Sequence, residues 1–114
     1  MSDQIYILKK DEIHKPLAWL VAKPQTPPMT LEARVELGYL LRLVQMGIHL
    51  AMPHSRPMTA IGKRCHELRV NDAKTTWRLF YRIDEDAIVM IDLAEKKTKA
   101  MLDLCKARLA HYDL

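Results

Sequence analysis

The chain has 114 residues, of which 49% are hydrophobic and 28% are charged, with a formal net charge of +4. This length is typical of one domain, and the apolar fraction suffices for a packed core, which excludes wholesale disorder. No stretch approaches the roughly 18 apolar residues of a membrane span, and the polar start does not resemble a signal peptide. We therefore expect a single domain over residues 1–114 that works in the cytoplasm.

Cysteines and histidines show no metal-ligand spacing. The two cysteines, Cys65 and Cys105, stand forty residues apart and belong to no Cys-x-x-Cys pair. Two free thiols packed inside a cytoplasmic protein are the expected outcome. The sequence thus predicts no structural metal, and it contains no motif that would hold a cofactor.

The first half of the chain is predicted to be mostly helical. Three prolines in residues 24–28 break any regular element there. Thr30 then has the position of an N-cap, apolar residues recur at helical spacing, and Gly47 follows as the C-terminal glycine. The expected elements are a short strand over 5–8, a short helix over 16–22 and a long helix over 31–46.

The second half is predicted to be a run of strands followed by a helix. A loop with room for one short strand covers 49–64, and turn residues then separate three β-type runs. The third run is almost entirely apolar, as expected for a strand covered on both faces. The expected elements are strands over 65–71, 76–84 and 87–94 and a helix over 98–112. Helices set apart from consecutive antiparallel strands indicate the α+β class.

The first hairpin places two arginines opposite each other. If 72–75 form the turn, Asn71 pairs with Thr76 and Arg69 faces Arg78 across the strands. Like charges in that position are unfavourable by roughly 0.2–1 kcal/mol, so a bound anion such as phosphate would account for them. Neutralisation by Glu67 on the same face, or a register slipped by one residue, remains the alternative.

Alternation along these strands defines two faces. One face carries an apolar set that would pack under the long helix: Leu68, Val70, Trp77 and Leu79. The other carries the charged set and one aromatic ring that could stack on a base: Glu67, Arg69, Arg78, Phe80 and Arg82.

Three lysines crowd the start of the last helix. The helix dipole disfavours cations there, so a ligand or an ordinary solvated surface would explain Lys96, Lys97 and Lys99.

Few side chains are suited to acid–base chemistry. Tyr81 is expected to point to the helix-covered face, and His54 and His66 are more often structural than catalytic at such positions.

Several segments together resemble the RelE/HigB toxin superfamily, and in particular its phage-derived HigB-like branch. They are "LLRLVQMGIHLAMPHSR" at 40–56, "HELRV" at 66–70, "WRLFYRI" at 77–83, "EKKT" at 95–98 and "KARLAHY" at 106–112. The resemblance covers about residues 17–113. It implies a twisted antiparallel sheet of about four strands, with two main helices packed on one face and a concave basic active surface on the other.

The resemblance also implies a function. Members of this superfamily cleave mRNA at the ribosome and are silenced by a small antitoxin, commonly a helix-turn-helix protein in this branch. Arg69 and Arg78 match the family arginines, the second at the position linked to the scissile phosphate, and Lys96 and Lys97 match its basic pair. Arg82, Phe80 and Lys99 would extend the RNA contact.

The catalytic base is open at this stage. Relatives often place a histidine or tyrosine near the end of the last strand, whereas this chain has Glu95-Lys96-Lys97 there. Glu67 could serve as the base, or the ribosome could supply the missing group. Two other functions remain: a non-enzymatic toxin that acts on a protein such as gyrase, and an inactive phage-derived RNA-binding protein.

Overall fold

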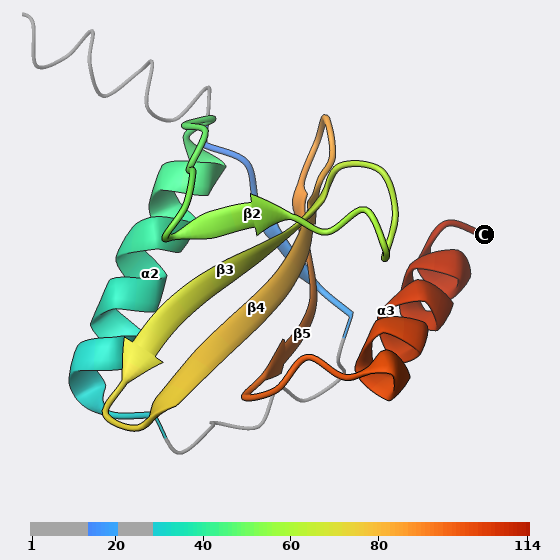
Figure 1. Ribbon diagram of the computed structural model, residues 1–114. Coiled ribbons are helices and arrows are strands. Elements are labelled where there is room, and N and C mark those ends of the chain that lie inside the picture. Colours follow the sequence, from blue (N-terminus) through green and yellow to red (C-terminus); the bar gives the residue numbers. More distant parts are fainter. Residues whose placement is uncertain (1–13, 21–28) are drawn as a thin grey trace, which may run out of the picture.

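A computed structural model describes residues 14–20 and 29–114 (Figure 1). Within these residues, five strands form one mixed sheet in the order β1-β5-β4-β3-β2, accompanied by two helices. The strands are β1 (Leu17–Trp19), β2 (Ser55–Pro57), β3 (Cys65–Asp72), β4 (Thr75–Ile83) and β5 (Ile88–Ala94), and the helices are α2 (Leu31–Gln45) and α3 (Lys99–Tyr112). The α+β class is therefore confirmed, with one strand more than expected. None of the helices described here is long and apolar enough to cross a membrane.

The segment at 16–22 was assigned incorrectly as a short helix. Residues 17–19 form β1, which runs parallel to β5 and pairs Leu17 with Ile88. Ile88 N–H donates to the Pro16 carbonyl at 2.9 Å, and Leu20 N–H donates to the Met90 carbonyl at 3.0 Å. Pairing with β5 therefore fixes the extended backbone of this segment. The strand expected over 5–8 and the proline break at 24–28 lie outside the described residues.

The ends of both long helices follow the expected capping. Thr30 accepts a hydrogen bond from Ala33 N–H and begins α2, while Thr98 accepts one from Met101 N–H and begins α3. Gly47 has φ of 85° directly after α2, a backbone angle that glycine adopts without the strain a side chain would bring. These caps explain why the helix boundaries agree with the sequence to within a residue.

Each face of the sheet carries its own apolar core. On one face, α2 packs on β3, β4 and β5 through Ala33, Leu40, Leu41, Val44, Leu68, Val70, Trp77, Leu79, Tyr81, Ile88 and Met90. On the other face, α3 and the loop before β3 contribute to a second cluster: Met58, Ile61, Cys65, Phe80, Val89, Ile91, Cys105 and Leu109. The four residues 88–91 of β5 are fully buried, as expected for a strand covered on both sides.

The two helices therefore lie on opposite faces, as Figure 1 shows, and the expectation that both pack on one face was wrong. The physical reason lies in β5. Its apolar side chains point to both sides of the sheet, and each side needs a cover. Cys65 and Cys105 are both free thiols buried in the second cluster, where burial raises the pKa of Cys105 to about 12.

Candidate functional site

The register of β2, β3 and β4 gathers four charged side chains on the sheet face that α3 partly covers. Arg69 is the partner of Arg78, and Asn71 is the partner of Thr76, which confirms the expected register. The turn is shorter than expected, since Asp72 pairs with Thr75. On the other side of β3, Arg56 of β2 is the partner of Glu67. We call Arg56, Glu67, Arg69 and Arg78 the arginine cluster.

Glu67 lies at the centre of this cluster and is fully buried. Its Oε2 accepts a hydrogen bond of 2.8 Å from Arg56 Nε, and its Oε1 lies 3.2 Å from Arg78 Nε. The second contact has ion-pair distance without hydrogen-bond geometry, because neither atom has a hydrogen-bond partner among the described residues. Glu67 is thus enclosed by two guanidinium groups, and its oxygens do not face solvent.

Arg78 is held from several sides. Its Nη1 donates to the main-chain carbonyl of Thr76 at 3.3 Å and also to that of Glu95, the first residue after β5. Its side chain is 20% exposed. The contact with Glu95 brings the turn that carries Lys96 and Lys97 next to the cluster, and both lysines are exposed. This fixed geometry preorganises a charged donor before any ligand arrives.

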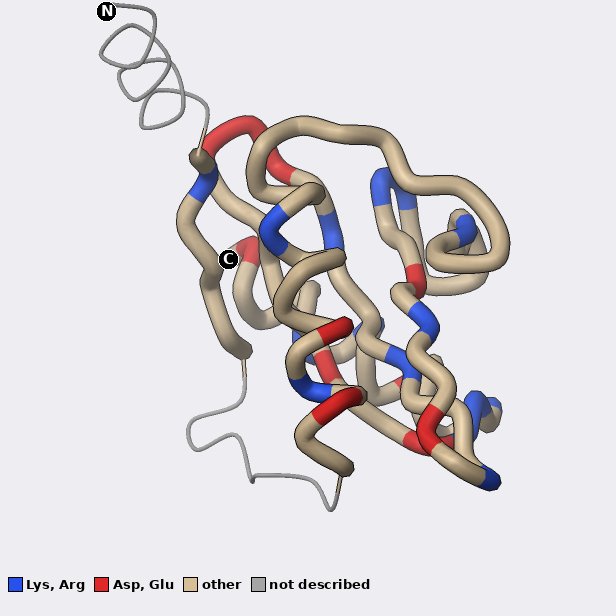
Figure 2. Tube along the Cα trace, turned by 90° about the vertical axis from the view of Figure 1, so that its left-hand side faces the viewer, with Lys and Arg blue, Asp and Glu red and all other residues tan. Residues whose placement is uncertain are grey.

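Arg69 contributes a charge that no described carboxylate neutralises. Its Nε is buried and has no hydrogen-bond partner among the described residues. A buried polar group left in that state costs about 1–3 kcal/mol, which an anionic acceptor would recover. With three arginines and one glutamate, the cluster carries a net positive charge. Figure 2 shows the wider setting, with many Lys and Arg segments (blue) toward the right-hand side of the view.

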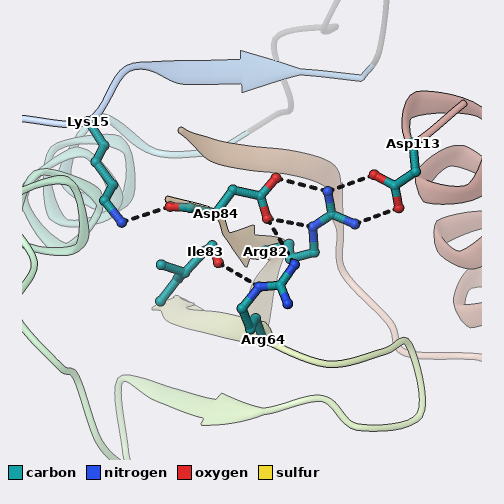
Figure 3. Close-up of polar contacts among 6 residues, drawn as sticks. All are labelled: Lys15, Arg64, Arg82, Ile83, Asp84 and Asp113. Carbon is teal, nitrogen blue, oxygen red and sulfur yellow. Dashed lines mark hydrogen bonds and ion pairs between the residues drawn. The ribbon is translucent and has the colours of Figure 1, made fainter. Parts of the chain in front are cut away.

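Two residues expected to bind RNA lie on the same face of the sheet but are covered or paired within the chain. Phe80 is fully buried beneath α3, so its ring is not available to stack on a base. Arg82 lies between two carboxylates, with its guanidinium bound to Asp84 at 2.7 and 2.8 Å and to Asp113 at 2.8 Å (Figure 3). These hydrogen bonds raise the pKa of Arg82, and those to Asp113 have a larger effect than those to Asp84. Arg82 therefore ties the end of α3 to the sheet.

Lys99 lies at the start of α3, where it is almost fully exposed. Its Nζ is 3.9 Å from Asp103 Oδ2 one turn later. Such an exposed pair contributes little to stability and leaves the lysine accessible.

Three titratable side chains near the cluster differ in their exposure. Tyr81 points to the α2 side, as expected, where its hydroxyl lies 2.9 Å from Ser55 Oγ and burial raises its pKa. His66 stacks on Tyr81, and burial lowers the pKa of that histidine. His54 is different, because its side chain is exposed and its carbonyl accepts a 2.8 Å hydrogen bond from Arg69 N–H.

Sequence reasoning missed Arg56, and it gave His54 little weight. Both residues depend on β2, a strand of three residues without a local signal of its own. The signal that could have found them is the alternation around Ser55, which is buried while Arg56 beside it points to the charged face. No group of three or more His, Cys, Asp or Glu suited to a metal occurs among the described residues.

Fold and site together define a small α+β domain with a preorganised, positively charged cluster on its sheet. No curated protein and no solved structure is matched by this chain. The family model "Phage derived protein Gp49-like (DUF891)" matches residues 19–110, which is most of the chain. The chain therefore belongs to the Gp49-like family of phage-derived proteins.

Proposed function

We propose that this chain is the toxin of a type II toxin–antitoxin pair and that it cleaves mRNA on the ribosome. The observation that carries the proposal is the arginine cluster, in which two guanidinium groups enclose one carboxylate while the third arginine, Arg69, is left without a carboxylate partner among the described residues. The resemblance to RelE/HigB toxins supports it, because the matching segments supply Glu67, Arg69 and Arg78. Membership of a phage-derived family is consistent with this function.

The cluster would act on the phosphate of the scissile bond. RNA cleavage by the neighbouring 2′-hydroxyl needs that hydroxyl deprotonated, the in-line phosphorane stabilised and the 5′-oxygen protonated. Arg69 and Arg78 would hold the phosphate and its developing charge, since guanidinium groups match phosphate oxygens in a bidentate manner. Loss of one such donor typically costs about 10²–10³ in rate. Lys96 and Lys97 would bind neighbouring phosphates.

Glu67 takes a positioning role in this proposal. A general base must come within hydrogen-bond reach of the proton that it removes, and the enclosed oxygens of Glu67 do not meet that condition. Instead, Glu67 would orient Arg56 and Arg78. We assign the proton-transfer role to His54, because its side chain is exposed and its main-chain carbonyl is hydrogen-bonded to Arg69 N–H in the neighbouring strand.

The proposed partners are the ribosome, its mRNA and a cognate antitoxin, expected to be a helix-turn-helix protein. A second candidate function is RNA binding without cleavage. The observation that favours it is the enclosure of Glu67, which leaves the cluster itself without an accessible base.

The test is induction of the chain in a bacterium, followed by labelled methionine incorporation and mapping of transcript ends. Arg69→Gln is the informative variant, because Arg69 Nε has no hydrogen bond to lose among the described residues. Lys106→Gln removes the same charge from an exposed position of α3 and is the matched control. We expect rapid arrest of translation with cuts in translated mRNA, abolished by Arg69→Gln and retained by Lys106→Gln.

The other outcomes separate the alternatives. Arrest without cuts would favour RNA binding alone, with His54→Ala then neutral. DNA damage before any loss of translation would indicate a protein target such as gyrase. Normal growth with abundant folded protein would refute a toxin function altogether.

A further inference from the structure

The outward face of α2 carries large apolar side chains that none of the described residues covers. Leu31, Val35 and Tyr39 are 72%, 64% and 62% exposed and follow one another at four-residue spacing, so they lie on the same side of the helix. Figure 1 shows α2 as the left-hand layer of the molecule. Single exposed apolar residues are ordinary, but a continuous row of them on one helix marks a contact surface.

Gly38 is an independent sign of such a contact. It lies inside α2, where glycine is less favourable than alanine by roughly 0.5–1 kcal/mol. It is exposed, and a Cβ added there would meet no atom within 4 Å, so packing among residues 14–20 and 29–114 does not require glycine. A glycine on this surface does allow the backbone or side chain of another helix to approach closely.

The residues of this face have the spacing of a helix–helix seam. Leu31, Val35, Gly38 and Arg42 are separated by four, three and four residues, so they lie along one side of the helix. Glu32 flanks the seam. Among the described residues, no ion pair involves Glu32 or Arg42. The two opposite charges at the ends of the seam are therefore available to pair with another molecule.

We infer that α2 is the surface through which two copies of this chain pair, with the two α2 helices antiparallel about a two-fold axis. The alignment that sets Val35 opposite Gly38 of the second copy also sets Arg42 opposite Leu31, next to Glu32. Each contact then occurs twice, as an isologous interface requires. The Val35 side chain fills the space over Gly38 of the second copy, and Arg42 comes close to Glu32 of that copy, so a second copy covers the glycine and supplies a charge partner for Arg42.

This pairing is independent of the proposed function. The α2 helix and the arginine cluster belong to opposite faces of the sheet. A dimer formed through α2 therefore leaves the arginine cluster of each copy accessible.

The first test is the mass of the purified full chain in sedimentation equilibrium over a wide concentration series. We expect the mass to rise from 13.3 kDa toward twice that value. Val35→Glu should weaken the dimer about tenfold or more, because it places a charge at the centre of the contact, against Gly38 of the second copy. Leu104→Gln changes an exposed apolar residue of α3 and should leave the dimer intact. A chain that stays monomeric at every concentration would overturn the inference.

Gly38→Gln separates an interface from a feature of the monomer. Glutamine is the better helix former, so the thermal midpoint of the monomer should stay equal or rise, while the dimer weakens. A dimer that tolerates both Gly38→Gln and Val35→Glu would use another surface and would also overturn the inference. Arg42→Glu should weaken the dimer as well, and adding Glu32→Arg in the same chain should restore it.

Discussion

Replacing Glu67 by glutamine removes the charge around which the arginine cluster is built. The side chain keeps its shape, so the change isolates the electrostatic contribution. Glu67 is fully buried, whereas the side chains of Arg56 and Arg78 are 36% and 20% exposed. The variant therefore leaves two guanidinium groups without their carboxylate in a partly enclosed setting.

The magnitude follows from these contacts. Removing one partner of a fully buried ion pair costs about 3–5 kcal/mol. Here both arginines can still reach water, and only the Arg56 contact is a hydrogen bond, worth about 1.5–3 kcal/mol. We expect Glu67→Gln to lower the free energy of unfolding by about 2–3 kcal/mol. That is a large share of the 5–15 kcal/mol typical of a domain, but it should leave the chain folded.

Urea unfolding followed by tryptophan fluorescence measures this effect. With an m-value of about 1–3 kcal/mol/M, the midpoint should fall by about 0.7–3 M. Glu36→Gln makes the same chemical change at an exposed position of α2 and should have a negligible effect. Equal midpoints for the two variants would refute the view that Glu67 organises the cluster. Arg56→Gln combined with Glu67→Gln should cost less than the two single changes added together.

Two further predictions concern side chains that hold the α2 face together. Asp72 accepts hydrogen bonds from Thr30 N–H, Thr30 Oγ1 and Trp77 Nε1, and the Thr30 contacts hold the pKa of Asp72 below its usual 3.8. Its contribution to stability is thus complete above pH 3.8 and is lost as the pH falls through the lowered pKa. Asp72→Asn should therefore lower the thermal midpoint at neutral pH and make that midpoint less dependent on acid pH. A variant whose midpoint falls with acid as steeply as that of the original chain would contradict this. Tyr81→Phe leaves the buried Ser55 hydroxyl without its partner and should cost about 1–2 kcal/mol in urea unfolding, whereas a stabilised variant would show that this bond is dispensable.

The central hairpin was predictable because its signals are local. Polar turn residues at 72–75 and the alternation of side chains in the strands on both sides favour the register that the structure has, in which Leu68, Val70, Trp77 and Leu79 meet α2. The position of Arg69 opposite Arg78 follows from that register alone. The actual turn has two residues rather than four, yet the pairing is the same.

The first strand had no comparable signal. Three residues, Leu17–Trp19, form β1 only because Ile88–Met90 lie beside them, some seventy positions later in the chain. Local propensity does not report such a partner, and a short apolar run fits a helix equally well. The face covered by α3 was missed for a different reason, since the resemblance outweighed the apolar pattern of β5.

The same distinction between local and distant information decides what could be known of the site. Alternation places Phe80 and Arg82 on the charged face, and both do lie there. What alternation does not give is which part of that face α3 covers, and α3 buries Phe80 while Asp113 at its end binds Arg82. The part left open is the part nearest β2, where Arg56 joins the two arginines of the hairpin. The site is therefore defined by the positions of α3 and β2, neither of which the hairpin sequence contains.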